Sequence, residues 1–393
     1  MIVAEVESDT VPPLKIRTDS VVRGMGRAPA KKNSFFKDMP FFRTTQVPET
    51  ATITSSTTLM TAGTGLSVPG YLSATLDVDF TCQDTLGEGG AAVLFQGTLI
   101  TDPVLKRNNG ERQCVIKIIK QVSGQTEISL KNAFQLEVAI MALFQSNRHI
   151  ARLLAFCPEH RIIVMRFYRL GSLQQLIHQP DHPLPNPHKY SPALVVKLLY
   201  ELANGLAQMH YTGVVHNDIK PANILLDVDD QNDMFTVLCD FGLSNAIEES
   251  LYRVKAMPRI AMKGASVAYA APEVFQRVFD AETSPTAEDT IFSIPQIVYE
   301  AVDTYAFGVV IFEMMTRTKP WGDEAKLEVV SKQVMAGERP MMTEEQQDAM
   351  AKIPAYQLLI PVMESCWHQQ PQKRPHFKKL LTQLYKIMSK HYR

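Results

Sequence analysis

The chain has 393 residues, of which 45% are apolar and 21% are charged. These fractions are typical of a globular protein, and they exclude a wholly disordered chain, a collagen and a coiled coil. Forty basic side chains stand against forty-one acidic ones, so the formal net charge is −1. Because a nearly neutral chain lacks the broad positive field that attracts nucleic acid or a membrane surface, we expect no nucleic-acid partner.

The five cysteines are scattered along the chain without any C-x-x-C pair (Cys82, Cys114, Cys157, Cys239 and Cys366). An odd and scattered set favours reduced thiols over a disulfide framework or a zinc site. The first residues are too acidic for a signal peptide, and no run reaches the roughly 18 apolar residues of a membrane span. We therefore expect a soluble cytoplasmic protein without a membrane span, and a nuclear location also fits.

Residues 1–78 show no sustained hydrophobic periodicity, and prolines interrupt every run. Such a segment cannot bury enough apolar surface to offset its ordering entropy, so we predict that it is disordered. Within it, residues 15–43 carry eight basic and two acidic side chains. This composition favours either a docking segment for a partner or a solvated basic tail.

Regular elements are expected from residue 79 onward. A strand leads into the glycine-rich stretch Leu86-Gly87-Glu88-Gly89-Gly90, and the apolar residues that follow continue as a strand. Periodicity and turn signals predict further strands at 114–119, near 153 and at 162–165. They also predict a helix at 129–145, with Ser129 as its N-cap.

Beyond residue 171 the sequence is mostly helical. Ser191 and Pro192 are the residue types preferred at the N-cap and first position of a helix, and Gly213 ends that helix. The motif at 303–308 opens another helix, apolar on all sides and therefore expected to be buried. A strand-rich first part and a helix-rich second part predict an α+β protein with two lobes and a cleft between them.

The glycine-rich stretch allows backbone N–H groups to approach phosphate groups without interference from Cβ atoms. Two nucleotide-binding folds are excluded. A Rossmann turn must open a helix, whereas a strand follows here. The sequence also lacks the G-x-x-x-x-G-K-[ST] motif of a P-loop NTPase. An isolated stretch of this kind most often marks a plain glycine hairpin.

Several groups of polar residues then follow in order. Lys117 lies in a buried apolar strand, where an ammonium group needs a counter-ion, and Glu137 in the next helix is the natural one. Residues 216–223 read His-Asn-Asp-Ile-Lys-Pro-Ala-Asn, which places a carboxylate, an ammonium and a carboxamide in one loop. Asp240-Phe241-Gly242 follows the strand expected at 235–239.

Together these motifs resemble those of the eukaryotic protein kinases over residues 79–390. Three later segments agree with the resemblance: Ala271-Pro272-Glu273, the motif at 303–308, and Cys366-Trp367 with Arg374-Pro375. The resemblance implies a bilobal α+β kinase fold. A small antiparallel sheet with one regulatory helix would span 79–165, a hinge 166–169 and a larger helical lobe 170–390. It also implies an ion pair between Glu273 and Arg374.

The resemblance further implies an enzyme that uses ATP and Mg²⁺, or Mn²⁺, to phosphorylate protein substrates. Asp218 would accept the proton of the substrate hydroxyl, and Lys220 would neutralise the transferring group. Lys117, steered by Glu137, would hold the α- and β-phosphates, and Asn223 and Asp240 would bind the metal. The residues expected to contact the nucleotide are Leu86, Gly87, Glu88, Gly89, Gly90, Leu94, Val115, Lys117, Met165 (the gatekeeper), Arg166, Phe167, Tyr168 and Leu225.

Two kinds of kinase are mixed in these motifs. Asp218-Ile219-Lys220-Pro221 and Ser266 resemble serine/threonine kinases, whereas residues 303–321 and 366–377 resemble tyrosine kinases. The combination is typical of the tyrosine-kinase-like group and implies transfer to Ser or Thr hydroxyls. The alternatives are a dual-specificity kinase that also modifies Tyr, and a pseudokinase that acts as a nucleotide-tuned signalling scaffold.

Three of the departures from the kinase pattern bear on ligand binding or regulation. Val115 replaces the usual Ala that packs on adenine. Asn217 replaces an Arg that binds a phosphate on the activation loop, so we expect activity that does not require phosphorylation there. Residues 280–295 are polar and indicate a surface insertion, either disordered or a docking site. That insertion and the basic residues 15–43 are the two candidate docking segments for a partner.

Overall fold

The computed structural model describes residues 58–60, 67–69, 78–79, 85–89, 91–99, 110–121, 126–158, 160–179, 181–184, 189–246, 264–283, 296–323 and 325–391. The basic residues 15–43, Gly90 and residues 247–263 and 284–295 lie outside this set. Within residues 1–78, which we predicted to be disordered, the structure describes residues 58–60, 67–69 and 78. Strand β1 (Thr58–Met60) pairs antiparallel with β2 (Ser67–Pro69), and β3 (Val78–Asp79) pairs with a later strand. Thr, Val and Leu favour strands even in a Ser/Thr-rich segment.

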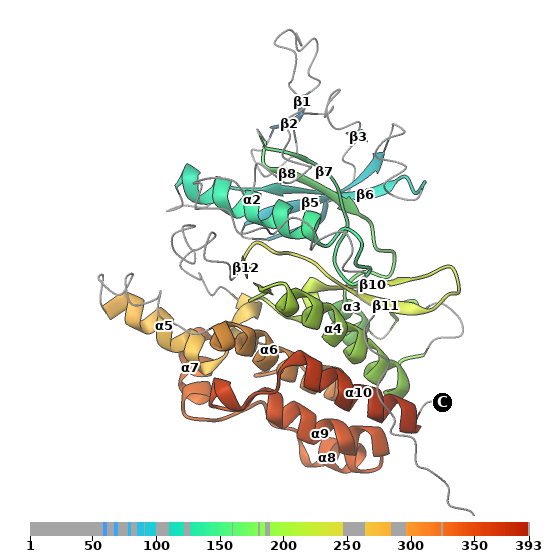
Figure 1. Cartoon of the computed structure of the whole chain (residues 1–393), viewed down its shortest axis with the longest axis vertical. Helices are drawn as coiled ribbons and strands as arrows, with labels where there is room; N and C mark the ends of the chain where they lie inside the picture. Colours follow the sequence, from blue (N-terminus) through green and yellow to red (C-terminus); the bar gives the residue numbers. More distant parts are fainter. Residues whose placement is uncertain are drawn as a thin grey trace, which may run out of the picture. The chain divides into compact units, whose positions relative to one another are not determined.

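A six-stranded antiparallel sheet forms the first lobe (Figure 1). The order is β3, β5, β6, β8, β7, with β4 paired to β5. The bounds are β4 Thr85–Glu88, β5 Ala92–Leu99, β6 Gln113–Ile119, β7 Leu153–Cys157 and β8 Ile162–Arg166. Alternate residues of β5 are buried, because successive side chains of a strand point to opposite faces. The strands predicted around the glycine-rich stretch are thereby confirmed.

Helix α2 (Glu127–Leu143) is the helix predicted after β6. Phe134, Val138 and Met141 are buried on one stripe, as expected. The predicted N-cap at Ser129 is wrong, since the helix begins two residues earlier and the Leu130 N–H already bonds the Thr126 carbonyl at 3.1 Å. An acidic Glu127 in the first turn suits the positive end of the helix dipole.

The second lobe is mainly helical (Figure 1). Its helices are α3 Leu173–His178, α4 Pro192–Tyr211, α5 Pro272–Thr283, α6 Gln296–Thr316, α7 Leu327–Met335, α8 Glu344–Ala351, α9 Pro354–Cys366 and α10 Phe377–His391. Ser191 caps α4, as predicted, by accepting a hydrogen bond from the Leu194 N–H at 3.3 Å. Helix α6 is buried along residues 301–315. It begins at Gln296, so the prediction that the 303–308 motif opens it is wrong.

Short strands in the second lobe set the loops between them. Strand β9 (Val214–Val215) pairs with β12 (Asn245–Ala246), and β10 (Ile224–Val228) pairs with β11 (Met234–Leu238). The loop at 216–223 therefore runs from β9 to β10, and the turn at 240–244 runs from β11 to β12. These pairings bring the two polar segments of the sequence side by side.

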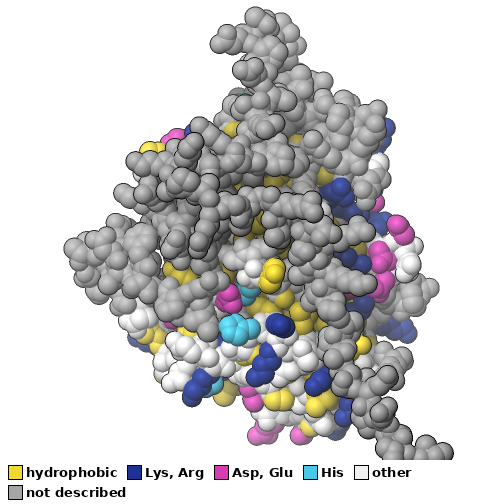
Figure 2. Space-filling model, in the orientation of Figure 1, with side chains coloured by type: hydrophobic (Ala, Val, Ile, Leu, Met, Phe, Trp, Pro, Cys, Tyr) yellow, Lys and Arg dark blue, Asp and Glu magenta, His cyan; other side chains and the backbone are white. Residues whose placement is uncertain are grey.

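Two surface features complete the description. Residues 280–283 of the predicted insertion continue helix α5, and the rest of that insertion lies outside the described residues. In the described parts of the surface that Figure 2 shows, acidic and basic side chains are interspersed, as a net charge of −1 leads one to expect. Among the described helices, none combines the length and the apolar character needed to cross a membrane.

Candidate active site

An ion-paired cluster joins the sheet to the turn at 240–242. The ammonium Nζ of Lys117, on β6, lies 2.6 Å from Oε1 of Glu137 on α2 and 2.7 Å from Oδ1 of Asp240. Lys117 and Glu137 are buried, so each charge depends on the other for compensation. The predicted pairing of Lys117 with Glu137 is confirmed, and Asp240 is a second partner.

Electrostatics keeps the Lys117 ammonium and the Asp240 carboxylate ionised, whereas burial raises the pKa of Glu137. Burial alone would lower the pKa of Lys117, but Asp240 and Glu137 together raise it above its usual value. The ammonium of Lys117 in turn lowers the pKa of Asp240 to about 2. At neutral pH the cluster therefore presents a permanent ammonium and a permanent carboxylate, and 46% of the Asp240 side chain is exposed.

The loop between β9 and β10 holds a second cluster. Oδ2 of Asp218 accepts hydrogen bonds from Nζ of Lys220 at 2.7 Å and from Nδ2 of Asn223 at 2.8 Å. Lys220 Nζ also donates to the hydroxyl of Ser266 at 2.8 Å. The second carboxylate oxygen of Asp218 takes part in neither of these bonds. Asp218 is thus held in place and oriented by its neighbours.

The two clusters are connected through the backbone. The Cys239 N–H donates to the Asn223 carbonyl at 3.0 Å, which links the residue before Asp240 to the Asp218 loop. Asp240 has φ +65°, a left-handed conformation that is strained for a residue other than glycine. Such strain persists only where the surrounding structure imposes it, and it is frequent at functional sites.

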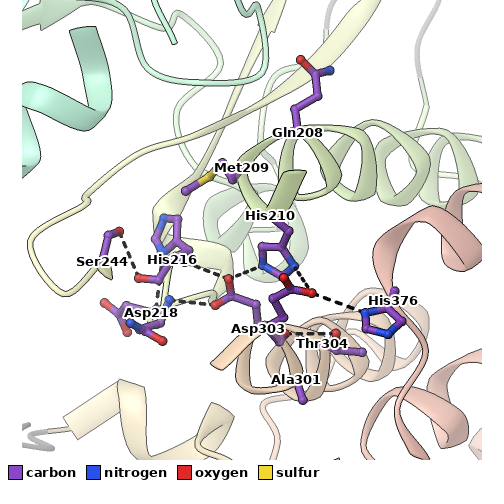
Figure 3. Close-up of polar contacts among 12 residues, drawn as sticks. Gln208, Met209, His210, His216, Asp218, Ser244, Ala301, Asp303, Thr304 and His376 are labelled. Carbon is purple, nitrogen blue, oxygen red and sulfur yellow. Dashed lines mark hydrogen bonds and ion pairs between the residues drawn. The ribbon is translucent and has the colours of Figure 1, made fainter. Parts of the chain in front are cut away.

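Asp303 on helix α6 binds the start of the 216–223 loop (Figure 3). Its oxygens accept hydrogen bonds from the backbone N–H groups of His216 and Asn217, at 2.8 and 2.7 Å. His210, on helix α4, approaches Asp303 at 2.8 Å. Sequence reasoning placed Asp303 in a helix but missed this role. The signal available was a carboxylate in a mostly apolar helix.

His216 is a packed structural histidine, and it is fully buried. The Asp218 N–H donates to its Nδ1 at 3.3 Å, so Nε2 carries the proton and donates to the Cys239 carbonyl at 3.1 Å. The ring lies 5.3 Å from that of Phe241. His216 therefore bridges the two polar segments and is not placed to act as a base.

The residues predicted to contact the nucleotide lie on elements around these clusters. Leu86 to Gly89 lie at the end of β4 and just beyond it. In the strand pairing, Leu94 stands opposite Lys117, and Val115 stands opposite Met165. The hinge follows β8, and Leu225 forms an isolated bridge with Ser172, just after the hinge. Among the predicted site residues, Gly90 lies outside the described part of the chain.

Comparison with known proteins agrees with this geometry. The family model described as "Protein tyrosine and serine/threonine kinase" matches residues 80–384. Because the match covers most of the chain, this protein belongs to that family. The antiparallel sheet with one helix and the helical second lobe are accordingly the bilobal α+β kinase fold that the motifs predicted.

Curated relatives show the same domain within longer proteins. The mouse ankyrin repeat and protein kinase domain-containing protein 1 is 30% identical over 233 residues, which are 58% of this chain and 27% of the relative. The bovine receptor-interacting serine/threonine-protein kinase 2 is 29% identical over 248 residues, 61% of this chain and 40% of the relative. The matched regions therefore span less than half of each relative. The likeness to the second supports the tyrosine-kinase-like assignment.

Proposed function

We propose that this protein is an active kinase that transfers the γ-phosphoryl group of ATP to Ser or Thr hydroxyls of protein substrates. The observation that carries the proposal is the connected set of Lys117, Glu137, Asp240, Asn223 and Asp218. A lysine paired with a helix glutamate and an aspartate free to meet a metal are both required for phosphoryl transfer in protein kinases. Both are present here with ionised side chains.

The glycine-rich stretch fits a phosphate ligand. A Cβ added to Gly87 would meet no atom within 4 Å, and Gly87 does not have a positive φ. Neither packing nor backbone conformation therefore requires glycine at this position. A close approach of phosphate groups to the backbone does give a reason for it. Lys117, with Glu137 as its fixed partner, would hold the α- and β-phosphates.

The oxygen donors fit a hard divalent cation such as Mg²⁺. Nδ2 of Asn223 donates to the carbonyl and to Oδ2 of Asp218, so its carboxamide oxygen points elsewhere and can ligate. Oδ1 of Asp240 accepts a hydrogen bond from Lys117, which leaves Oδ2 as the oxygen that can bind the metal. Bound there, Mg²⁺ would neutralise charge that develops on the phosphates. Asn223 and Asp240 would be its protein ligands.

Asp218 would orient the substrate hydroxyl and accept its proton. Its held carboxylate needs no reorganisation before it does so, which lowers the barrier to transfer. Lys220, fixed between Asp218 and Ser266, would place its charge beside the transferring phosphoryl group. The contact of Lys220 with Ser266 favours transfer to Ser or Thr, because it joins the two residues whose motifs resemble those of serine/threonine kinases. A dual-specificity kinase is the second candidate.

A transfer assay with labelled ATP and a generic protein substrate tests the proposal. The wild-type protein is expected to transfer phosphate, and Asp218→Asn is expected to reduce kcat by at least about a thousandfold while nucleotide binding persists. Phosphoamino-acid analysis of the product should show Ser and Thr. Phosphotyrosine would support dual specificity, and nucleotide binding without transfer by the wild type would identify a pseudokinase.

Lys117 on β6 and Lys120, which follows the end of that strand, offer a matched pair of variants. Lys117→Met is expected to abolish transfer, since Met keeps the apolar stem and removes the charge. Lys120 pairs with Glu88 of the glycine-rich stretch. An exposed ion pair of this kind contributes little, so Lys120→Met should keep activity within a few-fold of wild type. The reverse pattern would contradict the assigned strand register.

A further inference from the structure

A buried carboxylate on β10 draws its charged partners from the hinge. Asp227 has an exposed fraction of 0% and follows Leu225 by two residues. Its Oδ1 lies 3.2 Å from Nε of Arg169, and its Oδ2 lies 3.5 Å from Nη2 of Arg166. These two arginines are the first and last residues of the hinge at 166–169. One carboxylate thus holds both ends of that segment.

Further bonds fix the same segment. The Leu170 N–H donates to the Leu226 carbonyl at 3.2 Å, and the Leu226 N–H donates to the Gly171 carbonyl at 2.9 Å. Arg169 Nη2 also donates to the Val228 carbonyl at 3.3 Å. The chain that leaves the hinge is therefore tied to β10 by backbone bonds. The Arg166 side chain has no such backbone support from β10, so its tie to that strand depends on Asp227.

The hinge side chains are engaged on the side of the first lobe as well. The Arg166 N–H donates to the Arg152 carbonyl at 3.1 Å, and the hydroxyl of Tyr168 accepts from the Arg152 N–H at 3.0 Å. The guanidinium of Arg166 lies 5.9 Å from the centre of the Tyr168 ring. The side chains of Arg166 and Tyr168 are thus engaged by neighbouring elements, as are the Arg166 N–H and the Tyr168 carbonyl, which accepts from the Gly171 N–H at 3.3 Å.

The buried Asp227 carboxylate constrains the position of the hinge through electrostatics. A buried charge is strongly disfavoured unless it keeps its partners. Oδ2 of Asp227 is buried and makes no hydrogen bond within the described part of the chain, so Arg166 is the charge that compensates it. A displacement of the hinge that removes either arginine leaves the buried Asp227 charge with only one of its two cationic partners. Movement of the hinge relative to β10 is therefore disfavoured.

We propose that Asp227 is a positioning residue that sets the hinge backbone for the adenine of the nucleotide, acting through Arg166 and Arg169. This inference rests on the proposed function, in which the hinge backbone binds adenine. Asp227 lies near the end of β10, whereas Asn223 precedes that strand and Asp218 and Asp240 lie in loops outside it. The loss of Asp227 should therefore weaken nucleotide binding and spare the chemical step.

The test compares Asp227→Asn with Asp233→Asn in the full chain. Asp233 immediately precedes β11, the second strand of the β10–β11 hairpin. It pairs with Lys197 at 2.9 Å and is half exposed, so Asp233→Asn controls for the loss of one negative charge in this hairpin. Calorimetric titration with ADP gives the Kd without turnover. Asp227→Asn is expected to raise the Kd for ADP and the KM for ATP by roughly fivefold or more. Its kcat and the KM for the protein substrate should stay within about twofold, and Asp233→Asn should match wild type.

The possible outcomes separate the two proposals. No ADP binding by the wild type would contradict the proposed function. ADP binding by the wild type that Asp227→Asn leaves unchanged, or a loss confined to kcat, would overturn the inference alone. If Asp227→Asn does not fold, Arg166→Gln and Arg169→Gln decide, because their side chains lie nearer the surface. Each is then expected to raise the Kd for ADP, and an unchanged Kd in both overturns the inference.

Discussion

The imidazole of His149 is buried between helix α4 and strand β11. Its Nδ1 donates to the Thr236 carbonyl at 3.0 Å, so the ring has a defined role as a neutral donor. A Cβ at Gly205 of α4 would come within 3.1 Å of the His149 Cβ, which explains a glycine inside a helix at this close approach. The burial of His149 and its hydrogen bond assign this side chain to the core.

We expect His149 to make the stability of the fold pH-dependent. Burial lowers the pKa of His149 from 6.5 to about 4. Between these values the unfolded chain binds a proton that the folded chain does not bind. The stabilisation is therefore complete above about pH 6.5 and is lost as the pH falls to about 4, by about 3 kcal/mol in all.

Urea unfolding at several pH values measures this effect. His149→Gln keeps a hydrogen-bond donor and removes the titration, so its unfolding free energy should fall less steeply over that range. The exposed His160→Gln is the control and should retain the wild-type slope. Equal slopes for wild type and His149→Gln would contradict the prediction.

At the scale of elements, hydrogen bonds between uncharged groups join the start of the activation segment, at residues 243–244, to the 216–223 loop. Nδ2 of Asn217 donates to the Leu243 carbonyl at 3.1 Å, and the hydroxyl of Ser244 donates to the His216 carbonyl at 3.1 Å. The pairing of β12 with β9 continues this connection. Asn217 has φ +64°, a conformation that Asn tolerates better than most residues. A short amide thus makes a contact that needs no phosphate.

We predict that activity does not depend on phosphorylation of the activation loop. Phosphatase treatment of the purified kinase, and the double substitution Ser250→Ala with Tyr252→Phe, should each leave kcat/KM within about twofold of the untreated wild type. Asn217→Ala, by contrast, should lower it, because the tie to Leu243 is lost. A large loss after phosphatase treatment would show that the basic residues of the loop bind a phosphate that Asn217 does not.

At the scale of the whole molecule, an ion pair joins residues 101 positions apart. Nη1 and Nη2 of Arg374 lie 2.6 and 2.9 Å from the two carboxylate oxygens of Glu273, as the motifs implied. Arg374 is buried and also donates to the carbonyls of Ala301 and His368, both at 2.8 Å. The pair fixes the start of α5 to α6 and to the segment before α10.

Removal of this arginine should strongly destabilise the protein. Arg374→Met leaves Glu273 without its partner and the Ala301 and His368 carbonyls without their hydrogen bonds, which typically costs about 3–5 kcal/mol. Denaturant unfolding measures the loss. Lys319→Met breaks an exposed pair with Asp323 and should leave the midpoint nearly unchanged. Similar midpoints for both variants would show that the buried pair is not a main support of the fold.

Much of the candidate site could be predicted from short stretches of sequence. Lys117, Asp218, Asn223 and Asp240 stand in local motifs whose residue types already indicate their chemistry. The strand that contains Lys117 depends on local periodicity, and the cap at Ser191 depends on local hydrogen bonding. Neighbouring residues determine both. Helix starts were less predictable, since α6 begins before its motif.

Only the tertiary structure decided the contacts between residues far apart in the chain. Asp303 supports His216 from 87 positions away, Asp227 receives Arg169 from 58 positions away, and Lys117 reaches Asp240 from 123 positions away. No local pattern specifies such partners, because they depend on how sheets and helices pack. The sequence by itself determined which polar groups the protein has and their order. Packing determined which of them meet, because a buried charge is stable only where the fold brings it a partner.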